Sequence, residues 1–133
     1  MFRKFDTYAL VTGAASGMGR IYAQRLAAKG YNLVIVDINA KGLEETAEIV
    51  KYSISADENI PNDLKGAFKV LVLVQDLSVM DAADQIWEKT EAEGCKVEVL
   101  VNNAGVMYCQ GIAETSERML KLIMMVQMNT PLM

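Results

Sequence analysis

Three glycines near the N-terminus have the spacing of a phosphate-binding turn. Gly13, Gly17 and Gly19 directly follow an apolar, β-prone run at residues 8–12, and apolar residues recur with helical spacing over residues 20–29. Gly13 allows a tight turn off the strand, Gly17 lets the backbone approach a pyrophosphate, and Gly19 lets the helix pack closely on the sheet. The helix N-terminus adds free N–H groups and the positive end of a dipole. This order of strand, turn and helix predicts a dinucleotide-binding site.

A carboxylate at the end of the next predicted strand indicates which dinucleotide would bind. Residues 32–36 form a second apolar, β-prone run, and Asp37 follows eighteen residues beyond Gly19. That spacing is close to the spacing of the acid that accepts hydrogen bonds from an adenosine ribose. A 2′-phosphate at this place would meet the negative charge of Asp37, with no Arg or Lys beside it. The sequence therefore predicts NAD in preference to NADP, and a glycine-rich turn with an ordinary surface Asp is the alternative.

The glycine spacing resembles that of a known family. Thr12-Gly13-x-x-x-Gly17-x-Gly19 is similar to the T-G-x-x-x-G-x-G turn of short-chain dehydrogenases/reductases. Residues 72–77 resemble the third strand of that family and include the Asp that contacts the adenine ring. Residues 99–105 resemble its fourth strand with the N-N-A-G signature, which in the family stabilises the central sheet and lines the cofactor site. The resemblance covers essentially the whole chain and implies an N-terminal NAD(P)-binding Rossmann portion.

The resemblance assigns a set of positions to cofactor binding. They are the turn residues and the residues that follow the strands, namely Thr12, Gly13, Ala15, Ser16, Gly17, Met18, Gly19, Asp37, Ile38, Asp76, Leu77, Asn103, Ala104, Gly105 and Val126.

The catalytic residues of the family have no clear counterpart. Family members carry a catalytic Ser and a Tyr-x-x-x-Lys pair after a fifth strand and its helix, and no Tyr of this chain is followed by Lys four residues later. The family also uses an Asn in its fourth helix to hold a proton-relay water. Gln127 occupies the equivalent position, and Asn129 lies two residues later on a different face of the helix. We therefore expect no catalytic residue in this chain, with Gln127 as the nearest equivalent of the family Asn.

The alternation of strands and helices predicts an α/β fold with a parallel sheet and right-handed crossovers. Together with the resemblance, it implies a truncated Rossmann-type three-layer fold with strand order 3-2-1-4 and helices on both faces. A second helix is expected over residues 41–52, capped by Asn39 or Asp37, and a third over residues 79–93, capped by Ser78. Residues 53–66 are expected to form an insertion with about one turn of helix.

Composition narrows the possible functions. The chain has 133 residues, 52% of them hydrophobic, a net charge of −4, two cysteines and no histidine. No apolar run is long enough to span a bilayer, and no signal peptide is evident. We expect one domain over residues 1–133, no metal site, no nucleic-acid binding, no membrane association and a cytoplasmic location.

Two functions are compatible with these patterns. The favoured one is the N-terminal cofactor-binding portion of an NAD-dependent short-chain oxidoreductase acting on an alcohol or ketone, which binds NAD without turnover and meets its small-molecule substrate only in a full-length form. The alternative is a genuine short, non-catalytic dinucleotide-binding or assembly module.

The chain is also expected to form a homo-oligomer. Residues 97–101 would form an apolar edge strand, and the nearly all-apolar residues 119–128 would form a helix buried in the core and at a subunit interface. A substrate-facing or membrane-lying helix is the alternative for this last segment.

Overall fold

Four parallel strands form the centre of the fold, which was obtained as a computed structural model describing residues 4–79 and 81–103. The strands are β1 (Tyr8–Thr12), β2 (Asn32–Asp37), β3 (Val70–Val74) and β4 (Val97–Asn102). Their order in the sheet is β3-β2-β1-β4, and each neighbouring pair is parallel. The predicted order 3-2-1-4 is therefore confirmed.

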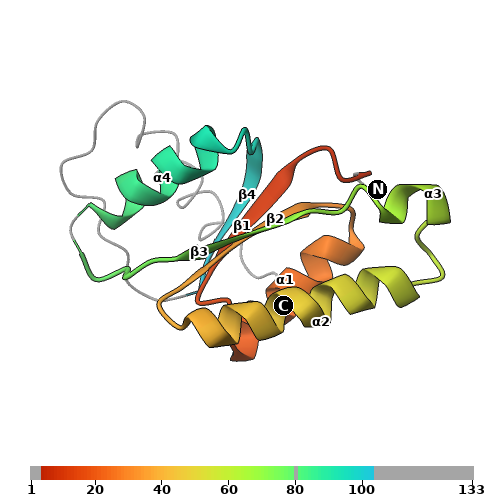
Figure 1. The fold of residues 1–133 in the computed structure, drawn as a ribbon, viewed down its shortest axis with the longest axis horizontal. Coiled ribbons are helices and arrows are strands. Elements are labelled where there is room, and N and C mark those ends of the chain that lie inside the picture. The colour runs from red at the N-terminus through yellow and green to blue at the C-terminus, as the bar shows by residue number, and fades with distance from the viewer. Residues whose placement is uncertain (1–3, 80, 104–133) are drawn as a thin grey trace.

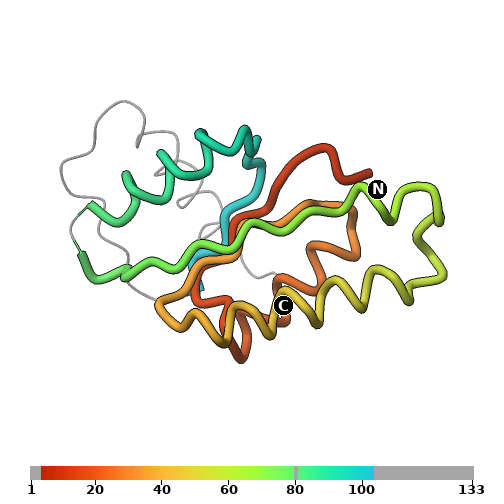
Figure 2. Tube along the Cα trace, viewed as in Figure 1, coloured from red at the N-terminus to blue at the C-terminus, as the bar shows by residue number. Residues whose placement is uncertain are grey.

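Helices cover both faces of this sheet (Figure 1). The helices are α1 (Gly17–Ala28), α2 (Ala40–Ala56), the single turn α3 (Asn62–Lys65) and α4 (Ala82–Ala92). Helices α1 and α2 lie side by side on one face, and α4 lies on the other. The tube in Figure 2 shows the chain crossing from β3 to β4 through α4, on the face opposite to α1 and α2. The predicted three-layer α/β architecture is confirmed.

Alternate residues of each strand supply two separate apolar cores. In β1, Ala9 and Val11 pack toward α1 and α2, whereas Leu10 packs toward α4. Leu10 is fully buried between Val34 of β2 and Leu100 of β4. Because side chains point alternately to the two faces of a sheet, continuous apolar strands need cover on both sides. This requirement explains the unbroken apolar runs of the sequence.

Helices α2 and α4 each contribute an apolar stripe to the core on their side of the sheet. Leu43 and Val50 of α2 are fully buried against the sheet. On the opposite face, Ile86 and Trp87 of α4 pack on Val34 and Leu100 as part of the second core. Trp87 is therefore a core residue.

The boundaries of α1 and α2 differ from the sequence-based expectation, whereas the cap of α2 agrees with it. Helix α1 begins at Gly17, three residues early, because the last part of the glycine turn is already helical. Helix α2 runs on to Ala56, because Ile54 continues its buried stripe beyond the expected end. The N-cap of α2 is Asn39, whose side chain accepts from the Gly42 N–H, in agreement with one of the two expected caps.

The expected cap of α4 was wrong. The helix begins at Ala82, and Ser78 lies upstream in a turn where its N–H and hydroxyl both donate to Asp76 Oδ1, at 2.9 and 2.6 Å. A charged carboxylate is a strong acceptor for a local N–H, so the Asp76 turn forms here in place of a longer helix.

Among the described residues, no helix is both long and apolar enough to cross a membrane.

Burial along α2 generates a stability prediction. Leu43→Ala should lower the free energy of unfolding by about 2–5 kcal/mol, because it removes a fully buried side chain and leaves a cavity. Ile49→Ala, on the exposed face of the same helix, is the matched control and should change it by about 0.5 kcal/mol or less. Urea unfolding followed by circular dichroism measures both, and equal effects would contradict the assigned orientation of α2.

Candidate functional site

The predicted site residues gather at one edge of the sheet. In a parallel sheet all carboxyl ends lie at the same edge, and here that edge carries the glycine turn after β1, Asp37 at the end of β2 and Asn103 after β4. Strand β2 lies on one side of β1 and β4 lies on the other. The order in which the strands are added to the sheet therefore reverses beside β1. Ligands of open α/β sheets bind in the crevice at such a switch point.

The glycine turn has room for a ligand above Gly17. Gly17 has a φ of +57°, and among the described residues no atom other than those of its chain neighbours and of the α1 backbone lies within 4 Å of the position that a Cβ would occupy. Its neighbours Ser16 and Met18 are exposed. The positive φ favours glycine, and the open space fits a close approach by a phosphate group at the N-terminus of α1.

Gly19 allows a close approach to the glycine turn, whereas the sequence predicted a close approach of the helix to the sheet. A Cβ at Gly19 would overlap the carbonyl group of Gly13 and crowd the Cα of Ala14. The close approach is therefore between the first turn of α1 and the glycine turn itself, at the end of β1. A side chain here would displace the turn before it affected the sheet.

Asp37 holds the glycine turn in place. Its Oδ2 accepts a hydrogen bond from the Ala15 N–H at 3.1 Å, and its Oδ1 accepts from the Asn39 N–H at 3.1 Å. Because an ionised carboxylate has about four acceptor positions, the half-buried group retains capacity for ribose hydroxyls. Ile38 next to it is 64% exposed, which leaves an apolar surface beside the carboxylate.

The loop after β3 presents an acid and a half-buried apolar residue. Asp76 is exposed, and its hydrogen bonds from the hydroxyl and the N–H of Ser78 lower the pKa of its carboxyl below the usual range. Leu77 packs at the margin of the core under α4. The expected adenine contact of Asp76 stays a prediction, made by a carboxylate that is ionised at neutral pH.

The ends of β1 and β4 are tied together by side chains. The Thr12 hydroxyl donates to Asn102 Oδ1 at 3.0 Å, and the Asn103 side-chain amide donates to the Gly13 carbonyl at 3.5 Å. These bonds attach Asn102 and Asn103 to the end of β1 and to the glycine turn. Ala104, Gly105, Val126 and Gln127 lie outside the described residues, as does the helix expected over residues 119–128.

Sequence reasoning missed three residues that contact the turn. Arg20, Gly42 and Thr46 connect α1 and the first turns of α2 to the backbone at Ala14 and Ala15. The one available signal was Gly42, a glycine inside a predicted helix, which usually marks a close approach. Within the turn, Arg20 and Thr46 donate to the carbonyl groups of Ala15 and Ala14, and such contacts have no signature in the sequence.

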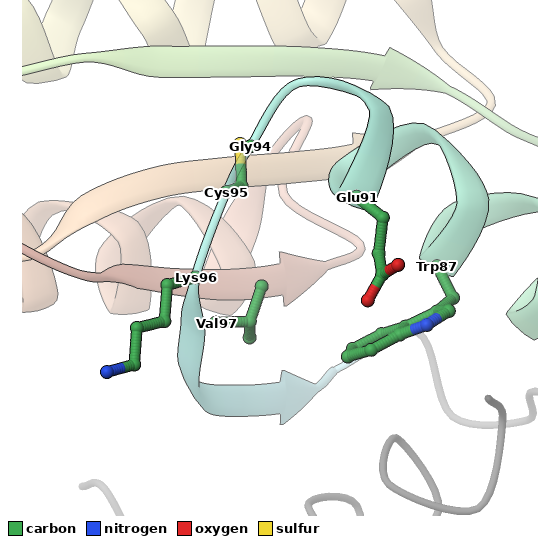
Figure 3. A pocket seen from close by; sticks show the side chains of 6 residues that line it. All are labelled: Trp87, Glu91, Gly94, Cys95, Lys96 and Val97. Carbon is green, nitrogen blue, oxygen red and sulfur yellow. The ribbon is translucent and has the colours of Figure 1, made fainter. Parts of the chain in front are cut away.

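A small cavity of about 220 Å³ lies away from this edge of the sheet. Trp87 and Glu91 project from α4 toward Val97, at the start of β4 (Figure 3). Cys95, which also lines the cavity, has its thiol pKa raised chiefly by burial, so it is protonated at neutral pH. Within residues 4–79 and 81–103, no group of three or more acidic, Cys or His side chains could hold a metal ion.

Comparison with known proteins agrees with this geometry. The sequence matches a family model described as short chain dehydrogenase over residues 7–133. Retinol dehydrogenase 10-A of Danio rerio is 30% identical over 128 residues, which cover 88% of this chain and 38% of that protein.

Solved structures share the same core. YwfH, an NADPH dependent reductase involved in bacilysin biosynthesis, matches with a TM-score of 0.60 and 28% identity over 73% of this chain and 34% of its own. A metagenomic short-chain oxidoreductase in complex with NADP matches with a TM-score of 0.56 and 27% identity, over 75% of this chain and 39% of its own. The chain thus spans well under half the length of these relatives. With the family match extending over residues 7–133 and the sheet and glycine turn arranged as described, the chain belongs to the short-chain dehydrogenase family.

Proposed function

We propose that this chain is the N-terminal cofactor-binding portion of an NAD-dependent oxidoreductase that acts on an alcohol or ketone. The observation that carries the proposal is the hydrogen bond of the Asp37 carboxylate, 3.1 Å from the Ala15 N–H, to the same glycine turn that leaves open space at Gly17. One group can then meet ribose hydroxyls while the adjacent turn meets the pyrophosphate. The name of the relative retinol dehydrogenase 10-A supports an alcohol as the substrate class.

Asp37 is the reason to propose NAD for this chain, although two of the matched structures are described with NADPH or NADP. A 2′-phosphate at the end of β2 would place negative charge next to a carboxylate that is already fixed by the Ala15 and Asn39 N–H groups. Arg20, a cation that also contacts the turn, already donates to the carbonyls of Ala15 and Gly42. The cost of pairing like charges favours the cofactor without a 2′-phosphate.

We propose that the described residues bind the cofactor and that other residues transfer the proton. A bound nicotinamide ring accepts or donates the hydride in this class of reaction. The described residues bind the adenosine and pyrophosphate parts and orient them at the end of the sheet. No Tyr-x-x-x-Lys pair occurs in the chain, so we propose that the substrate pocket and the acid–base group belong to a longer protein.

Cofactor choice is testable with a charge-matched pair of variants. The unchanged chain should bind NAD more tightly than NADP in calorimetric titrations. Asp37→Ala should weaken NAD binding by about tenfold or more, because hydrogen bonds to a charged group contribute about 1.5–3 kcal/mol, and the preference for NAD should narrow. Glu58→Ala, an exposed acid in the loop before α3, removes the same charge and should leave both affinities unchanged. Equal affinity of the unchanged chain for NAD and NADP would overturn the proposed preference.

The isolated chain should show no measurable alcohol oxidation. A positioned acid–base group contributes about 10²–10⁴-fold to such a rate, and the family Tyr and Lys have no counterpart in this sequence. The rate of alcohol oxidation is measured as NADH production with a panel of primary and secondary alcohols. The purified protein is first shown by mass spectrometry to comprise residues 1–133. Robust turnover would show that the chain contains an acid–base group other than the family pair.

A further inference from the structure

Three consecutive carbonyl groups of the glycine turn accept hydrogen bonds from side chains. Asn103 donates to the Gly13 carbonyl at 3.5 Å, the Thr46 hydroxyl donates to the Ala14 carbonyl at 2.7 Å, and Arg20 Nη2 donates to the Ala15 carbonyl at 2.6 Å. The three donors come from the end of β4, from α2 and from α1. All three carbonyl oxygens are thereby directed at protein groups.

Because each peptide unit is planar and trans, the direction of a carbonyl also fixes the direction of the N–H that follows it. In each unit the carbonyl and the following N–H point in opposite directions. The Ala14 N–H reaches the Val36 carbonyl at 3.2 Å, and the Ala15 N–H reaches Asp37 Oδ2 at 3.1 Å. In the third unit, the carbonyl of Ala15 is held by Arg20, so the Ser16 N–H points away from Arg20.

This orientation matters because the turn is the proposed pyrophosphate site. A carbonyl oxygen directed at a phosphate would repel it, whereas an N–H would donate to it. The contact between Arg20 and the Ala15 carbonyl is the shortest of the three, and a charged donor makes it a strong one. The peptide between Ala15 and Ser16 is therefore the one whose orientation depends most directly on Arg20.

Arg20 is itself held from several directions. Its Nε–H donates to the Thr46 hydroxyl at 2.9 Å, and its Nη2 also reaches the Gly42 carbonyl at 3.3 Å. Thr46 is fully buried, so its hydroxyl gives the guanidinium a fixed anchor. A Cβ at Gly42 would lie 2.7 Å from the Ala15 Cβ, which shows how closely α2 approaches the turn. The Glu45 carboxylate, 3.7 Å away and largely exposed, adds little to this arrangement.

We infer that Arg20 is a positioning residue for cofactor binding: it turns the Ala15 carbonyl away from the pyrophosphate site and so directs the Ser16 N–H toward it. This inference rests on the proposed dinucleotide function of the same site. Thr46 and Asp37 act with Arg20, because they fix the preceding peptide unit from opposite sides. Arg20 does not contact the phosphate in this arrangement; its effect passes through the backbone.

The test compares two ligands that differ only in the part bound by the turn. Adenosine and ADP are titrated into the unchanged chain and into Arg20→Gln, with binding followed by NMR. Loss of the guanidinium should weaken ADP binding by about tenfold, as expected for a strong hydrogen bond, and leave adenosine binding within about twofold. Glu45→Gln removes the nearby carboxylate without altering the hydrogen bonds of Arg20 to the turn and to Thr46. This variant should bind both ligands as the unchanged chain does.

Arg20→Lys provides a second variant where Arg20→Gln does not fold, as judged by circular dichroism. An ammonium group on this side chain can donate to the Ala15 carbonyl but lacks the planar fork that reaches Thr46 at the same time. The expected result is a smaller, ADP-specific loss of about two- to fivefold, because one of the strong hydrogen bonds is retained. ADP affinity equal to that of the unchanged chain would contradict the inference.

The outcomes separate the inference from the function on which it rests. An unchanged chain that binds neither ligand would overturn the proposed function and the inference together. An unchanged chain that binds ADP, with an Arg20→Gln variant that binds it equally well, would overturn the inference alone. A parallel loss of ADP and adenosine binding would show that Arg20 only stabilises the fold, which also contradicts the positioning role.

Discussion

The peptide groups between β1 and α1 lie outside any regular element, and the candidate site depends on how they find hydrogen-bond partners. They have left the sheet ladder and have not yet entered the helix, while buried backbone groups are almost always paired. Their partners come from Val36 and Asp37 at the end of β2, from Thr46 in α2 and from Asn103 after β4. The turn is therefore shaped by segments up to 90 residues away in the sequence.

The two-sided sheet makes these partners available at one place. Parallel pairing of β1 with both β2 and β4 aligns the ends of the three strands, and cores on both faces fix the helices above them. Small residues at the contact, Gly42 against Ala15, let α2 approach the turn closely. This approach brings Thr46 within reach of the turn. Packing in the core and hydrogen bonding at the edge are therefore consequences of the same helix placement.

Asp37 has a structural role that is compatible with the proposed recognition of the cofactor. The same carboxylate accepts from the turn through one oxygen and from Asn39 through the other. A cofactor that used the remaining acceptor positions would bind to a group whose direction is already set, so little ordering would be required on binding. Relatives matched in structure are described with NADP or NADPH, and this acid is the local feature on which the NAD proposal for this chain depends.

The sequence by itself determined the elements that have a strong local signal. Apolar strand runs, the glycine spacing, Asp37 and the family resemblance were enough for the parallel sheet, its order and the location of the turn, because periodicity and glycine placement are local properties. The start of α4 was not predicted, because Asp76 competes locally for Ser78. Only the tertiary structure revealed Arg20, Thr46 and Gly42 at the site. They reach the turn through backbone carbonyls and through one close approach, and contacts of that kind exist only once β1, α1 and α2 have packed together.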